Sequence, residues 1–140
     1  MANIIPTAFK TELLSGTHNF ANGGNSFKLA LYTSNPYSAS STAYVTTNEV
    51  SSSGTSYTAG GQVLDSQAVA ATSTTGHVDF ADETFASVTL TAAFAAIYND
   101  TNSDKLCLVL DFGGNKTATN GDFVVQFPTA NASDAIIRIA

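Results

Sequence analysis

The stretches VTLTAAFAAIY (residues 88–98) and LCLVLDF (residues 106–112) decide the fold expected for this chain. In each of them apolar side chains recur at every second position, so that Val88 and Tyr98 are expected on the same face. A period of two places successive side chains on opposite faces of a strand. Both stretches also contain β-branched residues, which favour strands over helices. They are therefore predicted to be two long strands.

Turn-forming residues separate the alternating stretches. Residues 99–104 are predicted to close a hairpin between the two long strands, because Asn, Asp and Ser favour turns. The pairs Gly113-Gly114 and Asn120-Gly121 bracket a second predicted loop, since both pairs tolerate a positive φ. Two consecutive hairpins, a meander, are therefore expected within residues 88–127. Further short strands are expected at residues 27–32, 77–80, 123–127 and 137–139.

The fold class that follows is all-β, in a single domain of residues 1–140. We expect an antiparallel β-sandwich, with a jelly-roll-like barrel as the second choice. One short helix is predicted between Pro6, which suits a first helical turn, and Gly16, which suits a helix end. Such a short helix is unstable alone, so Phe9 and Leu13 are expected to dock it on the rest of the domain.

Charge and composition exclude several classes of function. The chain has 5 basic and 11 acidic residues, giving a net charge of −6, whereas phosphate binding needs clustered Lys and Arg. We therefore expect no nucleic-acid partner. No apolar run approaches the roughly 20 residues needed to cross a membrane, and no signal peptide is recognised at the start. A single cysteine, Cys107, excludes an internal disulfide.

Two groups of acidic residues are candidates for metal or catalytic sites. Asp100, Asn102 and Asp104 have the spacing of a calcium loop's first ligands, but Lys105 stands where that loop requires glycine. A polar hairpin turn is the expected interpretation. The second group is Asp79, Asp82 and Glu83, which is expected at a solvated strand edge.

The remaining reactive residues give no recognisable catalytic spacing. His18 and His77 have no Cys or carboxylate partner that the sequence identifies, and no nucleophile-elbow motif occurs. Cys107 is expected as a small buried residue within a strand. No catalytic residue, metal ligand or cofactor is therefore assigned.

Two segments stand out as candidates for contact with a partner. Residues 34–61 form a long Ser/Thr-rich segment that holds Tyr37, Tyr44 and Tyr57, and long loops in compact domains are usually functional or mobile. Two interpretations of these tyrosines remain open: interface anchors, or a cover folded back over the core. Residues 1–6, with Ile4 and Ile5, form a possible N-terminal arm.

Taken in order along the chain, a series of stretches resembles a family of small structural proteins encoded by tailed bacteriophages. The series covers most of the sequence. The stretches are FKTELLSG (9–16), FKLALYTS (27–34), NEVSSSG (48–54), YTAGG (57–61), VDFAD (78–82), AIY (96–98), LDFGG (110–114), GDFVVQF (121–127) and AIIRI (135–139).

This resemblance implies a virion component without catalytic residues. The favoured member is a capsid decoration or cement protein, made in the host cytoplasm and bound to the major capsid protein on the capsid exterior. Such a protein stabilises the shell because it binds only the assembled state. A homo-oligomer is expected, and a trimer would match the local three-fold sites of an icosahedral lattice. The expected contact residues are Ile4, Ile5, Phe9, Tyr37, Tyr44 and Tyr57.

Two other classes are kept as alternatives. The first is a tail, neck or fibre module, which would take part in tail assembly or bind a host glycan through Tyr37, Tyr44 and Tyr57. The second is a glycan-acting enzyme, which would need two carboxylates about 5 to 10 Å apart in a cleft. The sequence supplies acids but no sign of such a cleft, so this class ranks last.

Overall fold

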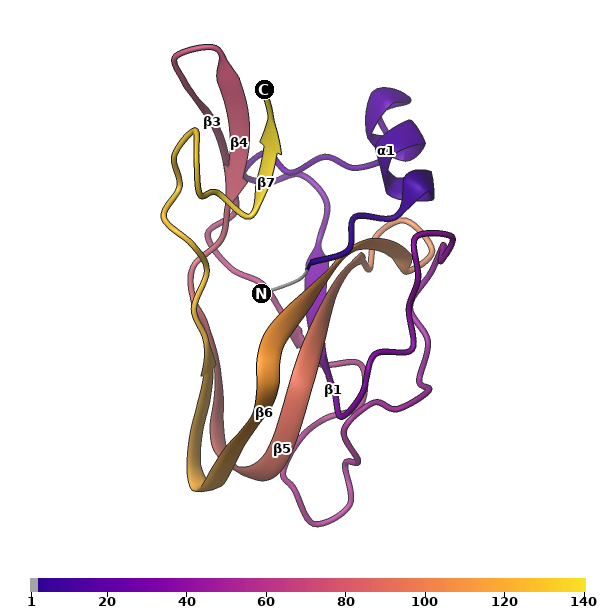
Figure 1. Ribbon diagram of the computed structural model, residues 1–140, viewed down its shortest axis with the longest axis vertical. Coiled ribbons are helices and arrows are strands. Elements are labelled where there is room, and N and C mark those ends of the chain that lie inside the picture. The colour runs from indigo at the N-terminus through magenta and orange to yellow at the C-terminus, as the bar shows by residue number, and fades with distance from the viewer. Residues whose placement is uncertain (1–2) are drawn as a thin grey trace.

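The computed structural model describes residues 3–140, and these fold into two antiparallel sheets with one short helix (Figure 1). The larger sheet has the strand order β2-β1-β5-β6, and the smaller has the order β3-β4-β7. The elements are α1 (Thr7–Leu14), β1 (Phe27–Tyr32), β2 (Gln62–Val63), β3 (Ala68–Thr72), β4 (Thr75–Asp79), β5 (Glu83–Asn99), β6 (Lys105–Val125) and β7 (Ile137–Ile139).

Strands β5 and β6 form one long hairpin that folds back on itself (Figure 1). Residues 100–104 join the two strands, and the predicted hairpin at this position is confirmed. Phe112 and Phe123 lie eleven positions apart in β6, which would separate them by about 36 Å in a straight strand. Their ring centroids are instead 6.0 Å apart. The hairpin therefore bends between them, and its two halves face each other across the core.

The bend occurs at an irregularity within β6 and not at a second hairpin loop. The register with β5 slips there, so that residues 112–115 oppose Ala93 alone. The backbone φ is 78° at Gly113 and 146° at Gly114, values that favour glycine. The predicted meander is therefore wrong, because these glycines allow β6 to bend and continue beside β5 without reversing.

The bend also changes which side chains of β5 face the core. Val88 and Ala92 belong to the core before the bend, whereas Ala95 and Ile97 belong to it afterwards. Tyr98, predicted to share a face with Val88, lies on the opposite face of the sheet. A slip in register moves the following side chains to the other face, which explains why the unbroken alternation predicted for residues 88–98 is wrong.

Both faces of the larger sheet are covered. The inter-sheet core draws on both halves of the bent hairpin as well as on β1, β4 and β7. A smaller apolar cluster lies on the other face, under the loop that follows β1. The predicted β-sandwich is confirmed, and the strands of the described region close no barrel. The smaller cluster consists of Ala30, Tyr32, Tyr37, Ala96, Tyr98, Leu106 and Val109.

The predicted N-terminal helix is confirmed as α1. Pro6 precedes its first residue, and Gly16 follows its end with a φ of 79°. Phe9 is only 1% exposed and belongs to the inter-sheet core, against which Leu13 also packs. These two side chains hold the short helix on the domain, as the sequence predicted.

The segment of residues 33–61 crosses the smaller cluster and connects β1 to β2. Backbone bridges from Ala43 and Glu49 tie it to β6 and β1. At its end, Gly61 has a φ of 79°, and an added Cβ would lie 1.8 Å from the Leu29 carbonyl oxygen. Only glycine permits so close an approach of two backbones.

Candidate functional site

The five tyrosines of the chain form one tyrosine cluster. Four of them lie at the smaller apolar layer, whereas Tyr57 belongs to the inter-sheet core and is joined to Tyr44 through Glu49. Two are on strands of the larger sheet, and three are in the loop that covers it. The Tyr32 and Tyr37 rings meet edge to face at 5.3 Å, and the Tyr44 and Tyr98 rings stack at 4.6 Å. The cluster consists of Tyr32 of β1, Tyr98 of β5, and Tyr37, Tyr44 and Tyr57 of the loop.

The Glu49 carboxylate is the main acceptor within this cluster. Its Oε2 accepts a hydrogen bond from the Tyr44 hydroxyl at 2.6 Å. Its Oε1 accepts from the Tyr57 hydroxyl at 2.6 Å and from the Gly60 backbone N–H at 2.7 Å. The Tyr57 oxygen in turn accepts from the Leu31 N–H at 3.0 Å. The Glu49 side chain thus joins the middle of the loop to its end, and Tyr57 links that end to β1.

A second chain of hydroxyls fixes the middle of the loop. The Tyr32 hydroxyl donates to the Val45 carbonyl oxygen at 2.7 Å, and it accepts from the Tyr37 hydroxyl at 2.6 Å. The Tyr37 oxygen accepts from the Val45 N–H at 3.1 Å. These buried polar groups are mutually satisfied, which is what their burial requires.

Burial raises the pKa of every tyrosine in the cluster above the ordinary value. For Tyr44 and Tyr57, the hydrogen bond to the Glu49 carboxylate raises the pKa further. The phenol groups therefore stay protonated and act as donors. This protonation suits a structural network, whereas proton transfer near neutral pH would require lowered values.

The structure decides between the two interpretations of the loop tyrosines. Tyr37 and Tyr57 are buried in the domain, and Tyr44 is half-buried against Tyr98. They fold the loop back over the sheet. In this conformation Tyr37 and Tyr57 therefore present little surface to a partner, while Tyr44 is only partly buried.

The expected N-terminal contact residues differ in their exposure and in their contacts with the rest of the domain. Residues 1 and 2 of the predicted arm lie outside the described residues. Ile4 pairs with Val109 of β6 through two backbone hydrogen bonds of 3.0 and 2.8 Å, so this part of the arm lies along its own domain. Ile5 is 37% exposed and remains available for contact. Phe9 is buried in the core and, like Tyr57, presents little surface to a partner in this conformation.

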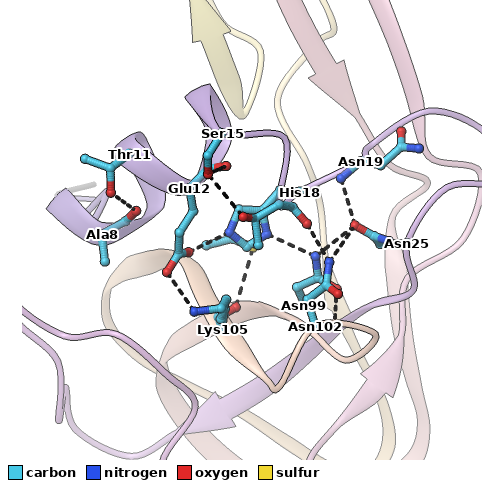
Figure 2. Close-up of polar contacts among 12 residues, drawn as sticks. Ala8, Thr11, Glu12, Ser15, His18, Asn19, Asn25, Asn99, Asn102 and Lys105 are labelled. Atoms are coloured by element: carbon cyan, nitrogen blue, oxygen red, sulfur yellow. Dashed lines mark hydrogen bonds and ion pairs between the residues drawn. The ribbon is translucent and has the colours of Figure 1, made fainter.

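A second polar cluster surrounds His18, between α1 and the β5–β6 turn (Figure 2). His18 Nε2 lies 2.8 Å from Glu12 Oε2, and Lys105 Nζ lies 3.2 Å from Glu12 Oε1. On the other side of the ring, His18 Nδ1 lies 3.0 Å from the amide nitrogen of Asn99. The cluster thus clamps α1 to the start of β6.

The hydrogen bonds of Asn99 define the tautomer of His18. The Asn99 side-chain oxygen accepts from the backbone N–H groups of Thr101 and Asn102, each at 3.1 Å. The Asn99 nitrogen is therefore the atom that donates to His18 Nδ1. His18 must then carry its proton on Nε2, which donates to Glu12.

Cys107 approaches His18 in an arrangement that resembles a nucleophile and its base. The sulfur lies 3.8 Å from His18 Nδ1, but that nitrogen already accepts from Asn99. Cys107 is fully buried, and burial, followed by the charge of Glu12, raises the pKa of its thiol above the ordinary value. An activated cysteine needs a lowered pKa and access for substrate. The three side chains therefore serve packing and alignment, and the prediction that Cys107 is buried is confirmed.

Sequence reasoning missed both clusters. Glu12 and His18 are separated by the end of a helix, and Asn99 and Cys107 belong to the β5–β6 hairpin, 81 and 89 positions from His18 along the chain. Glu49 has no local partner at a helical or strand spacing that would mark it. The one available signal was the position of three of the five tyrosines in a single loop segment.

The two acidic groups weighed in the sequence serve as local structure. Asp100 pairs with Lys28 at 3.5 Å in the β5–β6 turn, and Asn102 bonds the Thr17 carbonyl oxygen. Asp82 accepts from the Phe127 N–H at 2.8 Å, and burial raises the pKa of Glu83. Within residues 3–140, no three His, Cys, Asp or Glu residues come together in a way that could hold a metal ion.

Two open apolar grooves mark the surface. The first, of about 480 Å³, lies inside the bend of β6, and the second, of about 380 Å³, lies beside the smaller sheet. In the described part of the chain, neither groove brings two carboxylates together. Their apolar lining residues include Leu110, Phe112, Phe123 and Phe127 in the first, and Leu13, Phe20, Val69, Val78 and Ile139 in the second.

Comparisons with known proteins identify no similar protein. No protein-family model, no curated protein and no solved structure matches the chain. Among residues 3–140, no helix has both the length and the apolar character to span a membrane.

Proposed function

We propose that this chain is a non-enzymatic structural protein of a tailed-bacteriophage virion, and that it decorates the outside of the capsid. The proposal names the major capsid protein as its partner. It rests on the series of stretches that resembles the phage family and on the way the domain uses its reactive side chains.

The observation that carries the proposal is that the tyrosine, histidine and cysteine side chains are buried or half-buried and form contacts within the domain. The tyrosine cluster fastens the covering loop through Glu49. The His18 cluster holds α1 on the domain through Glu12, and Cys107 is fully buried next to His18. These contacts make a rigid body from a chain with one long loop. A rigid body that bridges subunits stabilises an assembled shell, because it binds that state and not the separated subunits.

The glycan-binding form of the tail alternative has less support. A sugar would need exposed aromatic rings for stacking. Tyr37 and Tyr57 are buried, which removes two of the three rings that this hypothesis used. We therefore favour a contact through the N-terminal segment, where Ile5 is exposed next to the backbone pairing of Ile4 with β6.

The proposal is tested with capsids of the encoding phage that lack this protein. Recombinant chain is added, and binding is measured by co-sedimentation and shell resistance by heating. We expect the chain to sediment with the capsids and to raise the temperature at which they release DNA. Binding to tails alone, or no binding to either, would overturn the proposal.

A pair of variants tests the contact within the same experiment. Ile5→Asp places a charge on an exposed apolar residue of the N-terminal segment, and we expect it to weaken co-sedimentation at least tenfold. Leu14→Asp is the matched control, because Leu14 is 89% exposed on α1. Equal binding of the two variants would show that the contact lies elsewhere.

A further inference from the structure

Strand β3 is an unprotected edge of the smaller sheet. It is the outer strand in the order β3-β4-β7, and all five of its residues are exposed. Figure 1 shows it on the hairpin that projects at one end of the molecule. Its sequence, AVAAT, contains no charge and no proline, the features that usually protect an edge from pairing with another chain.

The other edges of the two sheets are short, partly covered or charged. Strand β2 has two residues and β7 has three. The edge of β6 is paired at Val109 with Ile4 and at Lys105 with Ala43. Within residues 3–140, the outer side of β6 beyond residue 111 is also unpaired, but it carries Lys116 and Asp122, and its register with β5 is irregular. Strand β3 is therefore a regular edge that has neither a pairing segment nor a charge in the described region.

The register of β3 with β4 identifies the unpaired backbone groups. Thr72 pairs with Thr75 across a two-residue turn, and Ala70 pairs with His77. The residues that close such a hairpin bond each other, and bonded pairs alternate along antiparallel strands. Thr72 and Ala70 therefore bond β4, whereas the N–H and C=O groups of Val69 and Ala71 point away from the sheet.

We propose that β3 pairs with β3 of a second copy of this chain, antiparallel about a two-fold axis at Ala70. In this register Val69 of each copy faces Ala71 of the other. Both residues present outward N–H and C=O groups, so each pair exchanges two backbone hydrogen bonds. The two three-stranded sheets become one six-stranded sheet. A closed two-fold contact of this kind uses the same strand on both copies.

The side chains along this seam are complementary. Val69 is 58% exposed and lies on the face of the sheet that carries Val78 and Ile137. In the pair, each Val69 lies beside Ala71 of the other copy, and Gly76 of that copy follows in the same row, one strand further on. Gly76 has open space where a side chain would be, with nothing within 4 Å of an added Cβ. The larger Val69 of one copy therefore packs beside the small Ala71 of the other.

The electrostatics of the seam also permit pairing between identical chains. Each copy carries a net charge of −6, so that two copies repel each other at long range. No charged residue lies in β3 itself, and its neighbours in register on β4 are uncharged except Asp79 at one end. In the two-fold register, Asp79 lies across β3 from Thr72 of the other copy and not from a second carboxylate.

The first test measures the mass of the purified chain in solution by light scattering over a concentration series. We expect a species of twice 14.5 kDa. Ala71→Pro removes an outward N–H without removing a bond to β4, and we expect it to give a folded monomer. Val63→Lys on β2 is the control, and we expect it to remain a dimer. A monomer, or a trimer, in the unaltered chain would overturn the proposal.

The second test detects the two-fold register directly. In that register the two Ala70 Cα atoms lie about 4.5 Å apart, within the range of a disulfide. We expect Ala70→Cys to form a covalent dimer under mild oxidation. Ala68→Cys is the matched control on the same strand and face, because its two copies would lie about 14 Å apart. Equal cross-linking of both variants, or none with Ala70→Cys, would refute the register.

This inference does not depend on the proposed function. A dimer that fails to bind capsids would remove the proposed function and leave the pairing of β3 intact. A monomer that binds capsids would refute the pairing of β3 and leave the proposed function intact.

Discussion

Replacement of Glu49 tests whether one carboxylate holds the loop of residues 33–61 on the sheet. Its oxygens accept three hydrogen bonds, from Tyr44, Tyr57 and the Gly60 N–H. Glu49→Ala removes all three and leaves the hydroxyl of Tyr57, which is 2% exposed, without its acceptor. Because water can reach part of the vacated site, we expect a loss of about 3 kcal/mol in the free energy of unfolding.

This loss is large enough to measure by thermal unfolding. With an unfolding entropy of about 2.1 cal/mol/K per residue, 140 residues give a fall in Tm of about 10 °C. Glu49→Gln keeps one acceptor oxygen and should lose about 1 kcal/mol. In that background Tyr44→Phe should cost less than in the unaltered chain, because the hydroxyl can then only accept a neutral hydrogen bond from the amide and no longer donates to a carboxylate. Asp65→Ala is the control, an exposed carboxylate whose removal should change the free energy by less than about 0.5 kcal/mol.

The reasoning would be refuted if Glu49→Ala unfolded at the same temperature as the unaltered chain. Hydrogen exchange provides an independent readout. In Glu49→Ala, the amides of residues 33–61 should exchange faster, while those of the bent β5–β6 hairpin should be unchanged below the transition. Uniform acceleration over the whole chain would mean that Glu49 supports the global fold and not the loop.

Three further predictions concern the same two clusters and the loop end. Since burial raises the pKa of all five tyrosines, the unfolded chain loses phenol protons first above pH about 10, and stability should fall as pH rises beyond it. Absorbance at 295 nm should then rise together with unfolding; a smooth titration of a folded chain would contradict this. Cys107 should react with a thiol reagent only after denaturation, and rapid reaction of the native chain would show that the burial is incomplete. Gly61→Ala should destabilise far more than Gly54→Ala, because both have a positive φ but only Gly61 is packed against Leu29; equal Tm values would contradict the close approach.

The alternation of apolar residues was sufficient to predict the sandwich and most of its strands, but not β2 or β3. It could not predict the bend of the long hairpin, because Gly113 and Gly114 suit a turn and a bulge equally well. Whether a turn or a bulge forms depends on whether the second half of β6 makes more favourable contacts with β5 or with another strand. That choice depends on contacts between residues far apart in the sequence, which a local pattern does not contain.

For the candidate site, too, the local sequence indicated the segment involved but not its contacts. The location of three tyrosines in one segment indicated that the segment was special, and both exposure and burial were compatible with it. Their burial depends on Glu49, which supplies acceptors for Tyr44 and Tyr57 within the same loop. For Phe9, the helix spacing correctly predicted docking on the domain, and that docking is what removes it from the surface.

The most direct test of the central claim is a search for density of this chain in an electron cryo-microscopy reconstruction of the intact phage particle that we propose contains it. We predict that the β-sandwich lies on the outer face of the capsid lattice, repeated with the major capsid protein and with Ile5 at the contact. Density only in the tail or neck, or none on the particle, would contradict the account.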